Sequence, residues 1–188
     1  MKKTIGVLAV QGAFTEHIST LVNLNADYVE IRQKSDFTSN IDGLILPGGE
    51  STVIGKLIQD LDLFHTLQKS ILNGLPVLGT CAGLILLAKN ILNENNVYLS
   101  TMDITVIRNA YGRQLGSFHT EGDFADMKNV AMTFIRAPYI ESVSDKVEVL
   151  SVIDNKIVAA RQDNMLVTSF HPELTKDSRI HSYFLNMI

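Results

Sequence analysis

A single cysteine, Cys81, occurs in the 188 residues. One thiol can form no intramolecular disulfide and cannot supply the four ligands of a thiolate zinc site. The pattern therefore favours a reducing compartment, and we expect a cytoplasmic protein with no bound metal. Only four prolines occur, and no repeat, low-complexity tract or Pro/Gly/Ser-rich linker divides the chain. We expect a single domain over residues 1–188.

The chain also lacks a strong charge of either sign and a long N-terminal apolar run. Its 16 Lys and Arg against 20 Asp and Glu give a formal net charge of −4. Without a positive field to gather phosphates, we expect neither a nucleic acid nor an anionic membrane as partner. The apolar run at residues 5–10 is too short for a signal peptide or a membrane span. The expected partners are small molecules or proteins.

Apolar runs and helical patterns alternate through the first half of the chain, which is typical of buried strands followed by helices. The expected strands lie at residues 5–10, 28–31, 43–46 and 77–80. The expected helices lie at residues 15–24, 63–72 and 83–89. The second helix has Asp62 as its candidate N-cap and Gly74 as its C-terminal stop. This succession predicts a parallel sheet with helices on both faces.

The second half has strand-like segments separated by short polar turns, which predict antiparallel additions to the sheet. These segments lie at residues 104–107, 132–135, 147–152, 156–160 and 166–170. A terminal helix from about residue 177 carries Ile180, Tyr183, Phe184 and Met187 on one stripe. The predicted fold class is α/β, with three layers: a mostly parallel central sheet, helices on both faces, and antiparallel additions.

The loops after the predicted parallel strands should meet at the carboxyl edge of the sheet, where the sites of open α/β sheets gather. One of them, Gly79-Thr80-Cys81-Ala82-Gly83, has the spacing of a nucleophile elbow, with small residues on both sides of the cysteine. The positive end of the following helix would favour the thiolate, which is the reactive form. A lone cysteine is more often an inert buried residue, but the elbow spacing favours a nucleophile.

The segment His171-Pro172-Glu173, after the last predicted strand, is the best candidate for the base. Pro172 disfavours helix at His171, and an extended backbone would place the imidazole and the carboxylate on one side. Glu173 would orient the imidazole and complete a Cys-His-Glu relay. Alone, the segment also fits a surface ion pair. The remaining histidines have no comparable setting, and we expect solvated or capping roles for His17, His65, His119 and His181.

Acyl transfer develops an oxyanion, which preorganised backbone N–H groups stabilise by about 3 kcal/mol each. The expected donors are Gly49, in the Pro47-Gly48-Gly49 loop, and Ala82, directly after the nucleophile. An ordinary Pro-Gly turn is the alternative for this loop. A Walker loop is excluded, because no Gly-Lys-Ser/Thr ending follows.

These motifs together resemble the class-I glutamine amidotransferases, and among them the glutaminase subunits of two-component pyridoxal 5′-phosphate synthases. The cysteine elbow and His171-Pro172-Glu173 are specific to the wider group. The matching pieces are Val10-Gln11-Gly12-Ala13 with Glu16-His17, residues 44–52, residues 79–84, Arg108-Asn109 with residues 112–114, residues 134–138, and residues 169–175. Of these, Gln11-Gly12-Ala13, residues 47–52 and residues 135–138 narrow the resemblance to the subunit family. The segment 121–130 and His119 fit the family pattern less well.

The resemblance implies that Cys81 attacks the side-chain amide of L-glutamine, releases ammonia, and leaves a glutamyl thioester that water hydrolyses with help from His171 and Glu173. Matching positions for glutamine binding are Gly49, Glu50, Ser51, Arg108, Ile135 and Arg136. Because glutamine is a zwitterion, its pocket needs an acid for the ammonium group and an arginine or backbone amides for the carboxylate. For both arginines, surface solvation is the alternative.

The resemblance further implies that ammonia passes to a synthase subunit that makes pyridoxal 5′-phosphate, so that this chain itself binds no cofactor. In the family, docking to the synthase activates the glutaminase, with the region of Gln11 and Gly12 at the contact, and twelve glutaminases decorate a dodecameric synthase. Two other functions stay open on the residues alone. They are a stand-alone cysteine hydrolase or amidase with the same relay, and a catalytically silent regulatory module.

Overall fold

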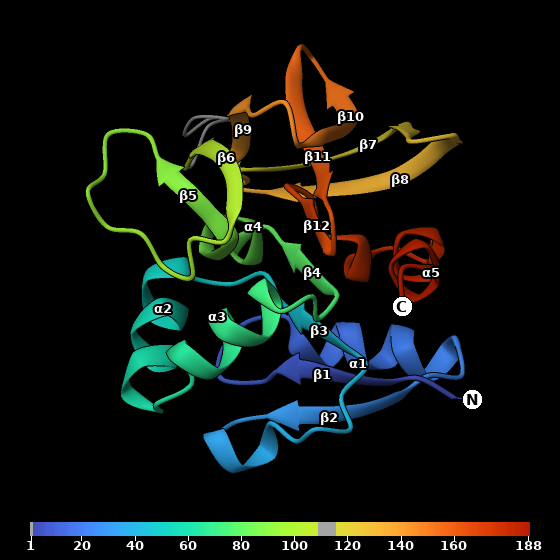
Figure 1. The fold of residues 1–188 in the computed structure, drawn as a ribbon. Helices are drawn as coiled ribbons and strands as arrows, with labels where there is room; N and C mark the ends of the chain where they lie inside the picture. Colours follow the sequence, from blue (N-terminus) through green and yellow to red (C-terminus); the bar gives the residue numbers. More distant parts are fainter. Residues whose placement is uncertain (1, 109–115) are drawn as a thin grey trace.

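A twisted central sheet forms the middle of the molecule (Figure 1). The computed structural model describes residues 2–108 and 116–188, so residues 109 and 112–114 of the family resemblance lie outside the described residues. In spatial order the sheet contains β2 (Asp27–Ile31), β1 (Thr4–Leu8), β3 (Gly43–Leu46), β4 (Val77–Thr80), β12 (Met165–Thr168), β11 (Lys156–Gln162), β9 (Tyr139–Val143), β6 (Met102–Ile107) and β5 (Ala88–Ile91). A further strand, β10 (Glu148–Ile153), pairs with β11.

The strands from β2 to β12 are all parallel to their neighbours. Beyond β12 the pairs β12–β11, β11–β9 and β9–β6 are antiparallel, as the second half of the sequence predicts. The prediction that the segment containing β12 is an antiparallel addition is wrong on one side, because β12 pairs parallel with β4. Apolar character cannot reveal strand direction, and all four residues of β12 are buried like those of β3 and β4.

Helices cover both faces of the sheet, which confirms the three predicted layers (Figure 1). Alternate residues of β3 divide between two cores: Leu44 and Leu46 pack in one, and Ile45 packs in the other. The first core also contains buried residues of α2 (Ser51–Asp60), α3 (Phe64–Leu72) and α4 (Ala82–Leu87). The second contains residues of α1 (Phe14–Asn23) and α5 (Arg179–Asn186).

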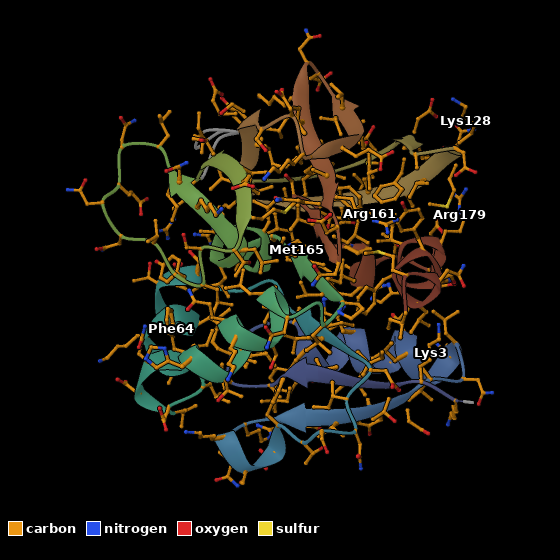
Figure 2. The ribbon with its side chains drawn as sticks, in the orientation of Figure 1. Lys3, Phe64, Lys128, Arg161, Met165 and Arg179 are labelled. Carbon is orange, nitrogen blue, oxygen red and sulfur yellow. The ribbon has the colours of Figure 1, made fainter. Side chains whose placement is uncertain are left out.

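A separate two-stranded ribbon, β7 (Ser117–Phe124) with β8 (Met127–Ile135), completes the second core. Phe118 and Phe134 stack with ring centroids 4.6 Å apart. The ribbon is tied to α5, because the guanidinium of Arg179 donates to the carbonyls of Lys128 and Asn129 at 2.9 and 2.8 Å. Arg179 and Lys128 accordingly lie close together in Figure 2. The segment 121–130, where the family pattern is weakest, forms the tip of this ribbon.

Two local predictions at helix ends are wrong. Asp62 does not cap α3: its φ is 54°, the N-cap is Leu63, and the carboxylate instead binds Lys34. The helix after Cys81 ends at Leu87 and passes directly into β5, so Lys89 lies in a strand. Gly74 follows α3 with a φ of 100°, which fits its predicted role as a stop. No helix within the described ranges is long and apolar enough to cross a membrane.

Candidate active site

Cys81 lies in a strained turn between β4 and α4, with φ 48° and ψ −97°. The turn has no room for larger neighbours: a Cβ on Gly83 would lie 2.1 Å from the carbonyl oxygen of Leu46, and one on Gly79 would lie 2.8 Å from Gly83. The backbone N–H of Cys81 donates to the backbone carbonyl of Thr168 in β12 at 2.8 Å. Local strain of this kind costs about 1–3 kcal/mol and is typical of functional positions. The turn has the features of the predicted elbow.

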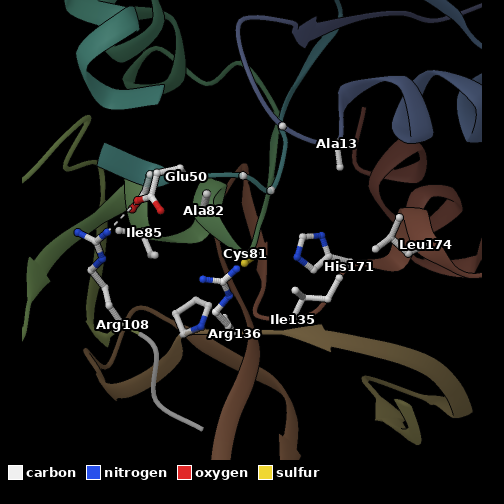
Figure 3. A pocket seen from close by; sticks show the side chains of 15 residues that line it. Ala13, Glu50, Cys81, Ala82, Ile85, Arg108, Ile135, Arg136, His171 and Leu174 are labelled. Carbon is white, nitrogen blue, oxygen red and sulfur yellow. Dashed lines mark hydrogen bonds and ion pairs between the residues drawn. The ribbon is translucent and has the colours of Figure 1, made fainter. Parts of the chain in front are cut away.

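His171 follows β12, and it therefore reaches the same edge of the sheet as Cys81. Its backbone N–H donates to the backbone carbonyl of Thr133 in β8 at 2.7 Å, which fixes the chain at His171. Its Nδ1 binds Oε1 of Glu173 at 2.7 Å, and Nε2 is left to face the cavity and Cys81 (Figure 3). The pair forms through the 3-10 turn η2 (Pro172–Leu174), so the expectation of an extended backbone across both residues is wrong. A surface ion pair is excluded, since both residues are buried.

Opposing effects set the charge of this pair. Burial alone would lower the pKa of His171, but hydrogen bonds to Cys81 and Glu173 and the attraction of their negative charges raise it to about 10. Burial opposes ionisation of Glu173, yet the proximity of His17 and the hydrogen bond to His171 hold the pKa of this carboxyl below its usual value. The imidazole is thus held as a cation between two acidic groups, as a thiolate nucleophile requires.

A cavity of about 350 Å³ opens in front of Cys81 and His171 (Figure 3). This volume is within the usual range of small-molecule sites, about 300–1,000 Å³. All six predicted glutamine-binding residues line the cavity, together with Gly12, Ala82, Cys81 and His171. Glu173 lies behind His171, away from the cavity. The structure thus brings together residues from both halves of the sequence.

The two arginines of the cavity differ in their contacts. Arg108 donates to Glu50 at 3.2 Å, to Thr52 at 3.2 Å and to Glu94 at 3.1 Å, and its side chain is only 19% exposed. Simple surface solvation is therefore excluded for Arg108. Arg136 is exposed, lies at the end of β8 with φ 41°, and has no side-chain partner among the described residues. Arg136 lines the same cavity as Arg108.

The Pro-Gly-Gly loop is hydrogen-bonded to the segment after β1. The carbonyl of Gly48 accepts from the N–H of Ala13 at 2.9 Å, and Oε1 of Gln11 accepts from the N–H of Glu50 at 2.9 Å. Gly12 closes the contact with φ 95°; a Cβ there would lie 1.9 Å from the Gly48 oxygen. The C=O and N–H of a trans peptide point in opposite directions, so the N–H of Gly49 points away from Ala13. These bonds hold the loop in one orientation.

Two histidines lie directly behind the relay, contrary to the solvated or capping roles expected for them. His17 of α1 and His181 of α5 are both fully buried. Nε2 of His17 lies 3.5 Å from Oε2 of Glu173 and 3.1 Å from Oγ1 of Thr80, and its Nδ1 lies 2.9 Å from Nε2 of His181. A sequence signal existed: each histidine lies on the apolar stripe of its helix, one turn before Leu21 and Phe184 respectively.

The other two histidines have no place in the site. His65 is exposed on α3, and His119 binds Oγ1 of Thr133 at 2.8 Å on the ribbon. Within residues 2–108 and 116–188, no group of His, Cys, Asp and Glu side chains could hold a metal ion.

Comparison with known proteins decides the relationship. A model of the SNO glutamine amidotransferase family matches residues 7–188. The chain belongs to this family. As an SNO family member it is a glutamine amidotransferase, which confirms the resemblance seen in the motifs. The protein named pyridoxal 5′-phosphate synthase subunit PdxT from Streptococcus pneumoniae strain D39 is 55% identical over 186 residues, covering 97% of this chain and 96% of that protein.

Solved structures agree with this assignment. One described as the crystal structure of a glutamine amidotransferase matches with a TM-score of 0.92 at 40% identity and covers 97% of each chain. The structure of PurLQS from Thermotoga maritima matches with a TM-score of 0.70 at 14% identity over 99% of each chain. At that identity the second likeness shows the fold alone. The predicted fold class of this SNO family member is confirmed.

Proposed function

We propose that this chain is the glutaminase subunit of a pyridoxal 5′-phosphate synthase, and that it hydrolyses L-glutamine to L-glutamate and ammonia through Cys81, His171 and Glu173. The observation that carries the proposal is a cavity lined by both the cysteine of the elbow and His171, with Glu173 bound to the imidazole at 2.7 Å behind it. The name and 55% identity of the pneumococcal relative support the synthase assignment.

The first half of the reaction is an acyl transfer to sulfur. The Cys81 thiolate attacks the side-chain carbonyl carbon of glutamine, and the carbonyl becomes an oxyanion that accepts hydrogen bonds from the backbone N–H groups of Gly49 and Ala82. The imidazolium of His171 gives its Nε2 proton to the departing nitrogen. The C–N bond breaks, ammonia leaves, and a glutamyl thioester remains on Cys81.

The second half returns the enzyme to its starting state. Neutral His171 takes a proton from a water molecule, whose oxygen attacks the thioester carbon. The second tetrahedral intermediate collapses with cleavage of the C–S bond, which releases glutamate and the thiolate. Glu173 holds the imidazole through Nδ1 in both halves, and stabilises the cation each time it forms.

The walls of the cavity suit a zwitterionic substrate. Glu50 would bind the ammonium group of glutamine, and the guanidinium of Arg136 with the backbone near Ile135 would bind its carboxylate. Arg108 already engages Glu50 at 3.2 Å and so fixes the acid in place. Ser51 and Gly49 line the same wall.

Delivery of ammonia requires a partner, and we place the synthase at Gln11 and Gly12. The bonds from Glu50 to Gln11 and from Ala13 to Gly48 support this, because they connect that surface directly to the oxyanion loop. Docking there would act on these two bonds and, through them, on the orientation of the Gly49 N–H, so that glutamine is hydrolysed only when the partner is bound. We further propose twelve glutaminase and twelve synthase subunits, one domain over residues 1–188, and a cytoplasmic location.

The decisive experiment measures glutamate and ammonia from glutamine, with and without the cognate synthase. We expect activity in the mixture and its loss, to the level of the uncatalysed reaction, in Cys81→Ala, with unchanged binding to the synthase. The matched control is His65→Ala on the exposed face of α3, which should keep wild-type turnover.

Three outcomes would contradict the proposal. Undiminished turnover by Cys81→Ala refutes the mechanism. Activity of the isolated chain on other amides, with none on glutamine, supports a stand-alone cysteine hydrolase instead. Failure of a glutamine-analogue electrophile to label Cys81 in the complex supports a catalytically silent regulatory module.

A further inference from the structure

One oxygen of Glu173, Oε2, has no hydrogen-bond donor assigned to it so far. Oε1 is occupied by His171, but Oε2 is buried and has no hydrogen bond within 3.5 Å among the described residues. A buried carboxylate oxygen without a donor is costly, at about 1–3 kcal/mol or more. A donor candidate on the core side is Nε2 of His17, which lies 3.5 Å from Oε2 in a side chain with no exposure to solvent.

The contacts of His17 and His181 decide which nitrogens carry protons. Burial lowers the pKa of His17 below its ordinary value and that of His181 to about 3, so both imidazoles are neutral and each has one N–H. The 2.9 Å contact between Nδ1 of His17 and Nε2 of His181 contains one of the two protons. Two arrangements are therefore available.

In the first arrangement His181 donates from Nε2 to Nδ1 of His17, and His17 keeps its proton on Nε2. That proton points to Thr80 and to Oε2 of Glu173, and the atom left without a partner, Nδ1 of His181, is only a lone pair. In the second, His17 donates to His181, a lone pair of His17 faces the carboxylate, and an N–H of His181 is buried without an acceptor. Buried N–H groups without acceptors are rare in proteins. The hydroxyl of Thr80 can donate or accept and fits either arrangement, so the choice rests on the other two groups. The lone pair facing the carboxylate and the unpaired N–H of His181 both disfavour the second arrangement.

We infer that His17 is a positioning residue of the glutaminase relay: its Nε2–H donates toward Oε2 of Glu173, and His181 fixes the tautomer that makes this possible. The carboxylate is then held from both sides, by His171 at the cavity and by His17 in the core. His17 touches neither substrate nor the reacting sulfur, so it acts only through the orientation and ionisation of Glu173. This inference rests on the proposed function for its kinetic readout alone.

The kinetic test compares three variants in complex with the synthase. His17→Leu fills the space without a donor, and we expect kcat to fall about 10- to 100-fold with KM within about twofold. His17→Gln offers one amide donor and one acceptor in place of the two ring nitrogens, and should recover most of the lost kcat. Leu21→Ala, one turn further on α1 and fully buried, should lower thermal stability without changing kcat.

The pH profile separates positioning from mere packing. The titratable groups that face His17 are Glu173 in η2, His171 directly before it, His181 in α5, and Glu16 in the same helix. In His17→Leu the ionised form of Glu173 loses its second donor, so the acid limb of kcat should move to higher pH, and in Leu21→Ala it should stay in place. A His17→Leu profile that matches Leu21→Ala in both kcat and pH overturns the inference.

Nitrogen-15 NMR of the full chain tests the tautomers without any activity. We expect His17 and His181 to be neutral, with protonated Nε2 and unprotonated Nδ1, between about pH 7 and pH 8. A protonated Nδ1 on His17, or its titration to a cation within that range, overturns the inference. A wild-type complex that forms no glutamate refutes the proposed function instead, while the NMR result still decides the positions of the protons.

Discussion

The two sides of Glu173 have the same chemistry and opposite charge states. On the cavity side, His171 has a raised pKa of about 10 because Cys81 and Glu173 stabilise its cation. On the core side, His17 and His181 have lowered pKa values, since complete burial outweighs the attraction of the same carboxylate. All three side chains are buried, and the difference lies in the direct hydrogen bonds to Cys81 and Glu173 that raise the pKa of His171 alone. Hydrogen bonds to acidic groups on both ring nitrogens keep the imidazole of His171 charged, whereas charges nearby without such bonds do not offset the burial of His17 and His181.

We expect the largest effect on activity from a change at Glu173, which contacts both His171 and His17. In Glu173→Gln, the amide has one acceptor atom, but both His171 and His17 donate to it, so an N–H faces an N–H in either orientation. We expect kcat/KM for glutamine to fall about 1,000-fold or more, which corresponds to about 4 kcal/mol. Steady-state glutaminase assays of the complex measure this.

The matched control is Glu148→Gln on the exposed face of β10, which should leave kcat/KM unchanged. If Glu173→Gln keeps nearly full activity, the carboxylate does not serve both histidines, and the comparison between the two sides fails.

An intermediate effect is expected from acid on the core side. Unfolded His181 binds a proton below its ordinary pKa of 6.5, but folded His181 does so only near 3. In between, the unfolded state binds more protons, so the free energy of unfolding should fall by about 1.4 kcal/mol for each pH unit as pH drops. His17 adds a loss of the same sign. Urea unfolding between pH 7 and about pH 4 measures the slope.

The variant His181→Gln should flatten this slope, because its amide can still donate to His17 but does not titrate. The cavity side has the opposite sign: the raised pKa of His171 contributes stability that is present below 6.5 and lost as pH rises toward about 10. An unchanged acid slope in His181→Gln would show that His181 is not held neutral by its surroundings.

The smallest effect is expected at the mouth of the cavity, away from the relay. Arg136→Ala removes the proposed partner of the substrate carboxylate, and we expect KM for glutamine to rise about tenfold, or about 1.4 kcal/mol, with little change in kcat. Lys69→Ala on the exposed face of α3 is the control of equal charge change. A fall in kcat with unchanged KM would instead show that Arg136 acts on the Cys81–His171–Glu173 relay and not on substrate binding.

The parallel half of the sheet and the elbow were predictable because their signals are local. Strands such as β3 and β4 are uninterrupted apolar runs, and the glycines around Cys81 are required by contacts within the same turn. The half-exposed strand β7 is not predicted, because its sequence contains no continuous apolar run. The change from α4 to β5 was missed because the apolar sequence continues through it without a glycine or proline.

The contact between His17 and His181 could not be predicted, because it joins two helices 164 positions apart in the chain. Each histidine on an apolar stripe signals burial but names no partner. The His171–Glu173 pair could be predicted because its members are two positions apart, even though a 3-10 turn rather than an extended segment brings them together.

The parallel pairing of β4 with β12 positions Cys81 and His171 independently of the residues that line the rest of the cavity. Neighbouring strands are about 4.8 Å apart, so Cys81 and His171 follow adjacent strands. In the sequence, most of the second half of the chain lies between these two strands. That long excursion supplies Arg108, Ile135 and Arg136 to the cavity wall. The segment between the two strands can therefore change in length and sequence while the pairing of β4 with β12 keeps the sulfur and the imidazole at the same spacing.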